Sequence, residues 1–479
     1  MIADGNWAPS LIAIISLLAA LSASGHAILN KSDIRATVAW VGVIWLAPLL
    51  GSLLYLLLGI NRIKRRATEL RHAMPRLQGE GNLAAFVPES LEHFVPEGLR
   101  PLSRLSNQVA RQPLLGGNQL AVLRNGDQAY PAMLKAIVRA RQSISLSSYI
   151  FNNDALGREF ADALMDAVER GVAVRVLIDA VGLRYTLPSI ESELRRGGVP
   201  MARFMPTRLP WNLPFMNLRN HRKLLVVDGH YGFMGGMNIA EGNCLARRPP
   251  HAVRDLHFAV EGPVVSELQA VFAEDWAFTT GESLSGNIWF PEPATPGASL
   301  ARVLADGPDE RHDTLRQVIT GALSVARRRV RIMTPYFLPD ATLQDALCTA
   351  ALRGVEVDVI LPEKNNLPLV AWACEAHLEP LLRWGVGIWQ APGPFDHSKL
   401  LTIDDSWALV GSANWDPRSL SLNFECNLEC YDEWLVGELK QGFDHHLADC
   451  KAVTREWLAS RGLPRRLRNG VARLFTPYL

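Results

Sequence analysis

The sequence predicts an α/β protein made of two tandem halves that share one active site, preceded by two N-terminal transmembrane helices. Three observations support this prediction. Two long uncharged stretches lie near the N-terminus, a pattern of helix, strand, helix and strand occurs twice further along, and each repeat contains the same motif of His, Lys and Asp. Strands that alternate with helices are typical of α/β domains with a largely buried sheet.

The two N-terminal stretches, 5–30 and 36–60, contain no Asp, Glu, Lys or Arg. A bilayer core about 30 Å thick needs about 20 helical residues, so each stretch is long enough to span it. The alternative for the first stretch is a signal peptide. A signal peptide begins with basic residues, whereas the only early charge here is Asp4. Polar side chains such as Ser24 and His26 make the first span the weaker of the two.

Basic residues predict the orientation of these helices. The loop between the stretches holds only Lys31 and Arg35, offset by Asp33. A denser basic group follows the second stretch: Arg62, Lys64, Arg65, Arg66 and Arg71. Cytoplasmic loops carry the excess of Lys and Arg, so the large C-terminal part is expected in the cytoplasm, together with the N-terminus.

The rest of the chain divides into two repeats. A β-branched segment after Arg170-Gly171 matches the segment after Arg353-Gly354, and a proline-rich stretch separates the halves. The predicted organisation is a membrane anchor (1–66), a connecting segment (67–118), the first half (119–284), a linker (285–298), the second half (299–455) and a basic amphipathic tail (456–479).

Composition excludes several classes of protein. Lys and Arg total 49 against 48 Asp and Glu, so the basic excess of a nucleic-acid-binding protein is missing. The six cysteines fit neither a zinc site nor a disulfide framework. They are therefore expected to be reduced thiols, which agrees with a cytoplasmic location. Their positions are Cys244, Cys348, Cys374, Cys426, Cys430 and Cys450.

Both halves contain the pattern His-x-Lys-x4-Asp. Its members are His221, Lys223 and Asp228 in the first half, and His397, Lys399 and Asp404 in the second. On a strand, residues i and i+2 share a face, so each His and Lys project together. The aspartates fall where a hairpin turns, and small residues ending in Asn238 and Asn414 follow the return strands. One such pattern is usually a surface strand, but its recurrence at matching places indicates function.

Two imidazoles and two ammonium groups in one pocket suit a phosphodiester. A neutral imidazole can attack phosphorus while the other, protonated, donates to the leaving alkoxide. Lysines supply compact positive charge for phosphate oxygens, so we expect neither a metal ion nor another cofactor. Asp255 and Glu425 follow the two motifs at similar distances. We expect both carboxylates to orient the imidazoles.

At this point the chain resembles the phospholipase D superfamily with its paired motifs, and within it the bacterial cardiolipin synthases. Tyr336-Phe337, Asn423-Phe424-Glu425 and the C-terminal residues 474–479 carry the closer likeness, whereas Gly235-Gly236 departs from the expected Gly-Ser. The resemblance implies two phospholipase D-like halves in a multi-pass protein of the bacterial inner membrane.

The same resemblance implies the reaction. A phosphatidyl group passes from one phosphatidylglycerol to another, which gives cardiolipin and glycerol through a phosphohistidine. His221 is the implied nucleophile and His397 the acid and base. The six motif residues are the implied catalytic set, and Asn238, Asn414, Asp255 and Glu425 support it or contact phosphate. The expected partners are phosphatidylglycerol and membrane lipids, without nucleic acid, and a homo-oligomer is left open.

Two further segments have alternative interpretations. The proline-rich loop 209–216 contains Trp211 and Phe215, which suit either insertion into the membrane interface or packing on the domain. The tail 461–479 mixes arginines with apolar residues, which suits either membrane-surface binding or packing.

Other functions remain as alternatives. Hydrolysis of phospholipids to phosphatidic acid uses the same chemistry with water as acceptor. A nuclease is disfavoured by the charge balance and the apolar stretches, and an inert scaffold by two complete motifs. Nucleotide-dependent synthesis is disfavoured because the sequence has no Gly-x4-Gly-Lys-Ser/Thr loop.

Overall fold

The computed structural model describes residues 7–31, 34–59, 86–87, 94–110, 112–206, 218–307 and 313–476. The chain forms two compact units, 1–66 and 67–479, and each is described by itself. The loop 209–216 and the basic group that begins at Arg62 lie outside the described residues.

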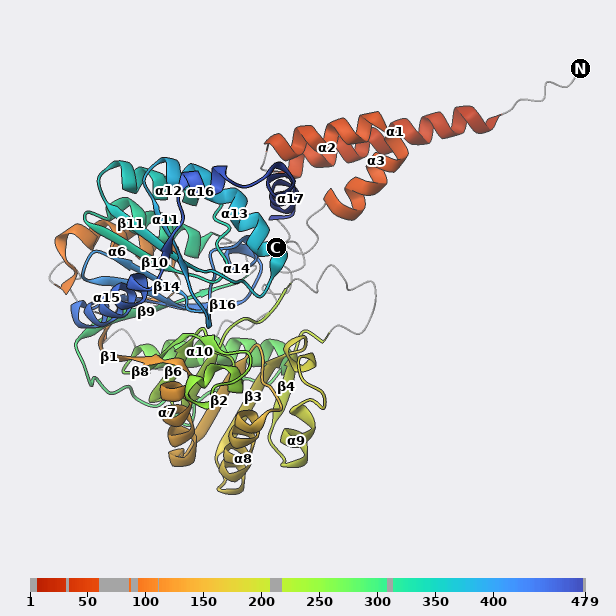
Figure 1. Cartoon of the computed structure of the whole chain (residues 1–479). Helices are drawn as coiled ribbons and strands as arrows, with labels where there is room; N and C mark the ends of the chain where they lie inside the picture. The colour runs from red at the N-terminus through yellow and green to blue at the C-terminus, as the bar shows by residue number, and fades with distance from the viewer. Residues whose placement is uncertain are drawn as a thin grey trace, which may run out of the picture. The chain divides into compact units, whose positions relative to one another are not determined.

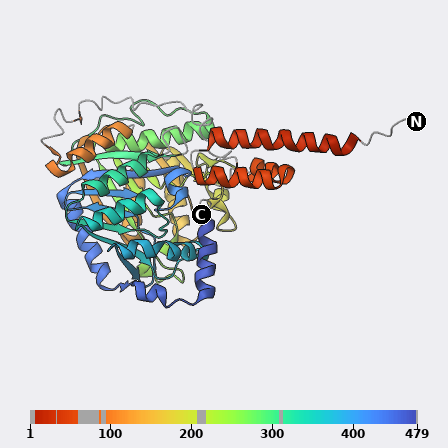
Figure 2. The same ribbon diagram turned by 90° about the horizontal axis from the view of Figure 1, so that it is seen from above.

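The N-terminal unit contains one long helix and a broken one. Helix α1 (Trp7–Asn30) is straight (Figure 2), and its segment Ser10–Asn30 is long and apolar enough to cross a membrane. The second apolar stretch forms α2 (Ile34–Leu46) and α3 (Pro48–Leu54), with a π-helical turn at Tyr55–Gly59.

The break between α2 and α3 falls at Ala47, whose φ of −143° and ψ of 80° are not helical, directly before Pro48. Proline lacks the N–H group that would continue the helix and disfavours a helical residue before it. The second stretch is therefore not one continuous helix, and the expected second spanning helix is not confirmed.

Small residues hold these apolar helices together. Helix α1 buries Ala20, Ala23 and Ala27. Gly51 of α3 lies so near the backbone of α2 that a Cβ atom there would be 2.3 Å from the carbonyl oxygen of Val43. Close backbone approach through small residues is typical of helices packed in a membrane.

The larger unit is built on a sheet of 15 described strands (Figure 1). Strands β1 (Leu115–Arg124) and β9 (Ser299–Asp306) pair antiparallel at its centre. Outward from β1 follow β8 (Leu256–Glu261), β6 (Tyr231–Gly235), β5 (Leu224–Val227), β2 (Ser143–Ser148), β3 (Ala173–Asp179) and β4 (Met201–Phe204). Outward from β9 follow β16 (Glu425–Tyr431), β15 (Trp407–Gly411), β14 (Leu400–Ile403), β10 (Arg329–Met333), β11 (Glu356–Pro362), β12 (Gly387–Ala391) and β17 (Lys451–Ala452).

From the centre out to β4 in one half and β12 in the other, corresponding strands follow in the same order. The α/β class predicted from the sequence is confirmed. The order arises because β2, β3 and β4 are parallel with helical crossovers, whereas β5, β6 and β8 are antiparallel neighbours. The matching strands β10, β11 and β12 are parallel in the second half.

Helices cover both faces of the sheet. In the first half they are α7 (Asn125–Arg139), α8 (Ala155–Glu169), α9 (Glu191–Arg196) and α10 (Val264–Thr280). In the second they are α11 (Thr314–Val325), α12 (Ala341–Leu352), α13 (Pro368–Arg383), α14 (Pro417–Ser421), α15 (Glu433–Ala448), α16 (Arg455–Ala459) and α17 (Leu463–Leu474), with α6 (Arg100–Val109) packed beside α11. Helices α10 and α15 pack into one apolar core with strands of both halves. All six cysteines are free thiols, as the sequence predicts.

Two short pairings join the halves beside the motifs. Strand β13 (Phe395–Asp396) pairs in parallel with β7 (Val253–Arg254). At the matching place of the other half, Asn220 forms a parallel bridge with Phe424. Each motif therefore begins on a segment that is bonded to the opposite half.

Candidate active site

The two motif histidines are fixed by the backbone of the opposite half. The N–H of His221 donates to the carbonyl of Phe424 at 2.9 Å, and the N–H of His397 donates to that of Arg254 at 2.7 Å. Phe424 and Arg254 directly precede Glu425 and Asp255. The predicted orienting carboxylates thus arrive next to the imidazoles, but crosswise.

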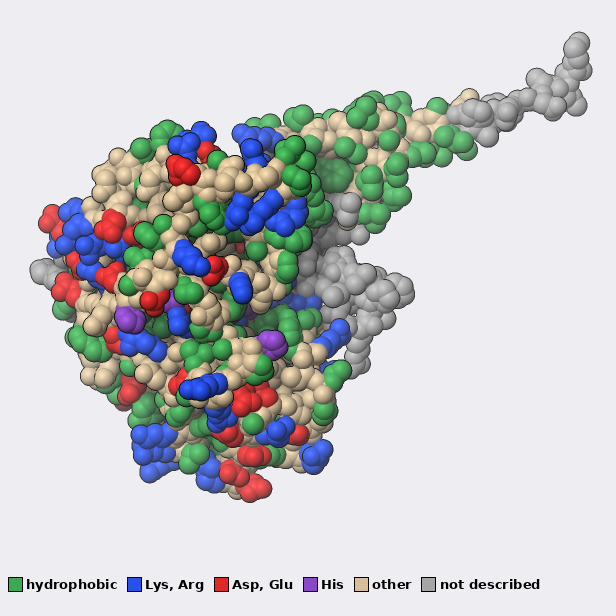
Figure 3. All heavy atoms as spheres, in the orientation of Figure 1, with side chains coloured by type: hydrophobic (Ala, Val, Ile, Leu, Met, Phe, Trp, Pro, Cys, Tyr) green, Lys and Arg blue, Asp and Glu red, His purple; other side chains and the backbone are tan. Residues whose placement is uncertain are grey.

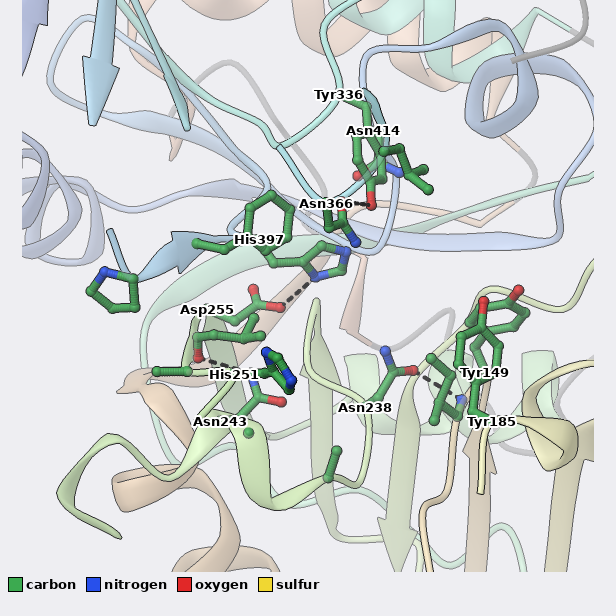
Figure 4. A pocket seen from close by; sticks show the side chains of 18 of the residues that line it. Tyr149, Tyr185, Asn238, Asn243, His251, Asp255, Tyr336, Asn366, His397 and Asn414 are labelled. Carbon is green, nitrogen blue, oxygen red and sulfur yellow. Dashed lines mark hydrogen bonds and ion pairs between the residues drawn. The ribbon is translucent and has the colours of Figure 1, made fainter. Parts of the chain in front are cut away.

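The side chains complete this exchange. Nδ1 of His221 lies 3.0 Å from Oε2 of Glu425. Figure 4 shows the other pair, in which Nδ1 of His397 lies 2.8 Å from Oδ2 of Asp255. Both carboxylates are buried. A carboxylate at Nδ1 holds that proton on the ring and leaves Nε2 for the substrate. The spacing within each half did not indicate which carboxylate orients which imidazole.

Both imidazoles line one cavity of about 1200 Å³ between the halves. Two tyrosines stand at matching places in its wall. The ring centre of Tyr149 lies 5.2 Å from that of His221, and the ring centre of Tyr336 lies 6.2 Å from that of His397. A cavity of this size has room for a lipid headgroup.

The motif lysines lie directly beneath the imidazoles. Nζ of Lys223 donates to the carbonyl of His221 at 2.7 Å, and Nζ of Lys399 donates to that of His397. Burial lowers the pKa of Lys223 to about 7 and that of Lys399 to about 8. Both ammonium groups therefore gain from a nearby anion, which stabilises their charged form.

The His221–Glu425 pair loses its extra proton at low pH. Burial is the largest influence on His221 and lowers its pKa to about 4, against the attraction of Glu425. Burial opposes ionisation of Glu425, but His221, Lys223 and the Ser412 hydroxyl outweigh it and hold the pKa of this carboxyl below its usual value. Above about pH 4, His221 is a neutral imidazole beside an ionised carboxylate.

The second pair behaves differently. Burial raises the pKa of Asp255 to about 7, against the opposing charge of Lys399. Burial, Lys399 and Lys223 lower the pKa of His397 well below its usual value. The His397–Asp255 pair therefore keeps one extra proton up to about neutral pH, whereas the His221–Glu425 pair does not.

The residues that contact the two carboxylates from the side away from the imidazoles also differ. The Ser412 hydroxyl donates to Oε2 of Glu425 at 2.6 Å. Gly236 takes the matching place beside Asp255, where an added Cβ atom would lie 2.3 Å from Oδ1. The Gly-Gly departure in the sequence thus makes room for the shorter carboxylate, and the hydroxyl partner is missing on that side.

The predicted asparagines both lie in the cavity wall. Oδ1 of Asn238 accepts the N–H of Ile150 at 3.0 Å, so its amide NH2 group is the part left for a ligand (Figure 4). Asn414 is buried, and its Oδ1 has no hydrogen-bond partner among the described residues. Polar groups of this kind are suited to fixing a headgroup.

The motif aspartates are not brought to the imidazoles, which corrects their place in the predicted catalytic set. Asp228 lies in the turn after β5, at the far end of that strand from His221. Its carboxylate accepts backbone N–H groups of residues 141–143 at 2.7 to 3.1 Å. Asp404 accepts those of residues 327–329 in the same way. Both residues have positive φ, 52° and 53°, and lock the hairpin that carries the His and Lys.

On the face seen in Figure 3, Lys and Arg are mixed with Asp and Glu over most of the larger unit, and basic side chains gather near α17 (Figure 1). Within the described ranges, no group of three or more His, Cys, Asp or Glu side chains is placed to hold a metal ion.

Comparison with known families identifies the relationship. The family described as "Cardiolipin synthase, PLD-like domain" matches residues 133–276 and 319–447, one motif in each segment. The chain belongs to this cardiolipin synthase family. A second family, described as phospholipase D-nuclease N-terminal, matches residues 9–59.

Individual cardiolipin synthases match over almost their whole length. One from Geobacillus kaustophilus (strain HTA426) is 32% identical and covers 99% of this chain and 96% of its own. Cardiolipin synthase A of Pseudomonas aeruginosa (strain LESB58) is 34% identical and covers 98% of this chain and 95% of its own. A solved phosphatidylserine synthase from Haemophilus influenzae has the same fold, with a TM-score of 0.62 at 16% identity over 79% of this chain and 100% of that one.

Several residues of this site could not be identified from the sequence. Tyr149 and Ser412 belong to segments that the repeat aligns, so a comparison of the two halves could have suggested them. Arg219 and Arg418 also line the cavity, and no motif marks them.

Proposed function

We propose that this phosphatidyltransferase of the phospholipase D type transfers a phosphatidyl group from one phosphatidylglycerol to a second, giving cardiolipin and glycerol. One observation carries the proposal. Two imidazoles face one cavity, and a buried carboxylate of the opposite half holds Nδ1 of each. Membership of the cardiolipin synthase family supports the same reaction.

In the first step, Nε2 of His221 attacks the phosphorus of the donor lipid. The P–N bond forms as the P–O bond to the headgroup glycerol breaks, and the His397–Asp255 pair gives its proton to the departing oxygen. Lys223 and Lys399 stabilise the charge on the phosphoryl oxygens. The products of this step are glycerol and a phosphatidyl group on His221.

In the second step, the terminal hydroxyl of another phosphatidylglycerol attacks the same phosphorus. His397, now neutral, takes the hydroxyl proton, the new P–O bond forms and the P–N bond to His221 breaks. One diester replaces another, so the exchange needs neither an activated donor nor an oxidant. The residue set likewise supplies its own cations in place of a metal ion.

The unequal proton affinities support this division of labour. His221 is neutral above about pH 4 and can serve as nucleophile, while the His397–Asp255 pair carries a proton to about pH 7 and can serve as acid. A catalytic acid works best when its pKa is near the working pH.

Helix α17 supports placement of the catalytic unit on a membrane. One side of α17 packs on α13, where Ala472 joins an apolar cluster with Leu338 and Val370, two residues of the cavity wall. Another side exposes an apolar stripe of Leu463, Leu467, Val471 and Leu474, each more than half exposed. We infer that this stripe enters the lipid interface beside the cavity, so both interpretations of the tail apply.

The anchor and its orientation complete the proposal. We infer that α1 crosses the bacterial inner membrane, that the apolar hairpin of α2 and α3 also inserts, and that the catalytic unit faces the cytoplasm. Reagents that label cysteines only from outside the cell test this arrangement, because free thiols such as Cys450 should then be protected in intact cells.

The deciding experiment incubates the purified full-length protein with vesicles of labelled phosphatidylglycerol and identifies the products by mass spectrometry. Cardiolipin and glycerol in equal amounts are expected. Phosphatidic acid as the main product would overturn transfer in favour of hydrolysis. Leu467→Ser with Leu474→Ser should lower turnover on vesicles more than on detergent-dispersed lipid, and equal loss on both would contradict the role of the stripe.

A further inference from the structure

Four arginines line the cavity: Arg219, Arg247, Arg248 and Arg418. The reaction as derived uses none of them. Two of the four, Arg219 and Arg418, each have a guanidinium nitrogen without a hydrogen-bond partner among the described residues, although Asp179 faces Arg219 and Asp416 lies in the cavity wall with Arg418.

Arg219 is buried at 3% exposure, two residues before His221. Its Nη1 lies 3.8 Å from Oδ1 of Asp179, which is within ion-pair range but beyond hydrogen-bond length. Asp179 is already engaged, since Oδ1 accepts the N–H of Val181 and Oδ2 accepts that of Asn220, both at 2.9 Å. Nη1 of Arg219 has no hydrogen-bond partner among the described residues.

Arg418 reaches the same part of the cavity from the other half. Its side chain is half-buried, and Nε likewise has no hydrogen-bond partner within the described ranges. Burial lowers the pKa of Arg219 and the charge of Asp179 opposes this, while the guanidinium groups of Arg418 and Arg184 lower it further. The N–H of Phe424 donates to the carbonyl of Arg219 and the N–H of Asn423 donates to that of Arg418, both at 2.8 Å, so the two arginines lie on adjoining segments. Two neighbouring guanidinium groups in a cavity wall, each with an N–H that lacks an acceptor among the described residues, indicate a place for an anion.

Arg247 does not share this feature. Arg247 is exposed, and its Nη2 lies 3.0 Å from Oε1 of Glu159 while its Nη1 lies 3.7 Å from Glu241. These carboxylates already neutralise its charge. Exposed ion pairs of this kind contribute little and leave little attraction for a ligand.

We propose that Arg219 and Arg418 form a subsite for the phosphodiester of the acceptor lipid, the phosphate that does not react. This inference rests on the proposed synthase function. The reacting phosphate occupies the His and Lys groups, and the acceptor brings a second phosphate that lies one glycerol bridge away from the attacked phosphorus. That second anion needs its own cations within the same cavity, and guanidinium groups bind phosphate through paired hydrogen bonds.

The subsite gives the enzyme a means of choosing its acceptor. Water and free glycerol carry no phosphate and gain nothing from the two arginines. A phosphatidylglycerol gains charge-assisted hydrogen bonds that hold its terminal hydroxyl at the phosphohistidine. The arginines therefore favour cardiolipin over both hydrolysis and the return of glycerol.

The test compares two acceptors on the same donor. Full-length wild type, Arg219→Gln and Arg418→Gln are each given phosphatidylglycerol vesicles with labelled glycerol, and cardiolipin formation is measured beside exchange of the label into phosphatidylglycerol. Both reactions use the same donor, nucleophile and acid. The ratio of cardiolipin formation to glycerol exchange should fall about tenfold to a hundredfold in either variant, the usual effect of losing a charge-assisted hydrogen bond. Arg247→Gln is the matched control and should leave the ratio unchanged.

The ratio also separates this role from general damage. A variant that folds poorly or binds the donor weakly loses both reactions together and leaves the ratio unchanged, which would overturn the subsite. An unchanged ratio with full activity would overturn it equally. Arg219→Lys keeps the charge and should recover part of the ratio. If the wild type makes no cardiolipin at all, the proposed function fails first, before any variant is compared.

Discussion

The two halves of the catalytic unit hold the same imidazole in different ways. On one side Glu425 supports His221 and is itself held by the Ser412 hydroxyl. On the other side Asp255 supports His397, and Gly236 leaves no hydroxyl beside it. The carboxylate with the extra donor stays ionised, and the one without it keeps a proton to about pH 7.

This difference shows how a duplicated motif can provide two chemical roles. A symmetric pair would give two imidazoles of equal proton affinity, and neither would be set as nucleophile or acid. Here one pair has a longer carboxylate that accepts from the Ser412 hydroxyl and the Asn423 amide, and the other has a shorter one beside Gly236, and these small changes bias one pair towards attack and the other towards proton donation.

The strongest challenge to this comparison removes the imidazole of His221. His221→Ala should reduce turnover on the order of 10^4-fold, because the covalent route is lost. Rapid acid quench of the wild type should trap a phosphatidyl adduct that peptide mapping places on His221, and the variant should show none. Recovery of the adduct on His397 would exchange the two roles while leaving the reaction class intact.

A second challenge removes the charge of each carboxylate. Glu425→Gln and Asp255→Asn should each slow turnover by about 10²- to 10³-fold, because neither amide stabilises an imidazolium. A donor lipid with a nitrophenolate leaving group needs no proton, so it should restore the release step in Asp255→Asn but not in Glu425→Gln. Equal rescue of both variants would show that the two pairs are interchangeable.

The pH dependence sharpens the comparison further. The value of kcat/KM should rise through about pH 4 as His221 loses its proton, and fall above about pH 7 as Lys223 and the His397–Asp255 pair lose theirs. The lower limb should change about tenfold per pH unit at its steepest, and the upper limb, where two groups lose protons near the same pH, by up to about a hundredfold. Asp255→Asn should remove the contribution of the pair to the upper limb, and a rate that is constant from pH 5 to about pH 9 would contradict the assignment.

Exchanging the neighbours of the carboxylates is a gentler test. Ser412→Ala should slow turnover by about tenfold, since a buried hydrogen bond to a charged group is lost. Gly236→Ser alone should do more harm, because its Cβ would displace Asp255. Gly236→Ser combined with Asp255→Glu should recover activity relative to Gly236→Ser, and thermal unfolding of all variants controls for stability. Additive losses in the double variant would show that the two positions are not coupled.

The smallest expected effect is that of a chelator. Neither half-site is expected to use a metal ion, so turnover in excess EDTA should match that of the untreated enzyme. Loss of activity that one divalent metal restores, measured in detergent to exclude effects on lipid packing, would overturn the mechanism for both halves.

Local patterns predicted much of this arrangement. The i, i+2 spacing places each Lys beneath its His, and the duplicated motif indicates one shared site. Asp255 and Glu425 were recognised by their position after the motifs. The crosswise pairing could not be predicted, because Glu425 reaches His221 through a bridge between distant segments, Asn220 and Phe424.

The structure limits two expectations: the place of the motif aspartates in the catalytic set, although the sequence already located them at the hairpin turn, and the second spanning helix, which is not confirmed. Asp228 belongs to the motif, yet a four-residue strand separates it from Lys223 and carries it to the turn. The second apolar stretch has the length and composition of a span, but Pro48 in its middle ends the helix. The absence of charged residues over a stretch of 25 residues does not reveal that the helix must break before Pro48.

The crosswise carboxylates also constrain how such a protein can evolve. A change at Asp255 acts on the imidazole of the other half, so a substitution in one repeat can inactivate the other. A half on its own would lack the carboxylate for its imidazole and would need a second molecule to supply it. Within one chain the two halves can differ in detail, but neither can be lost without removing the carboxylate of the other.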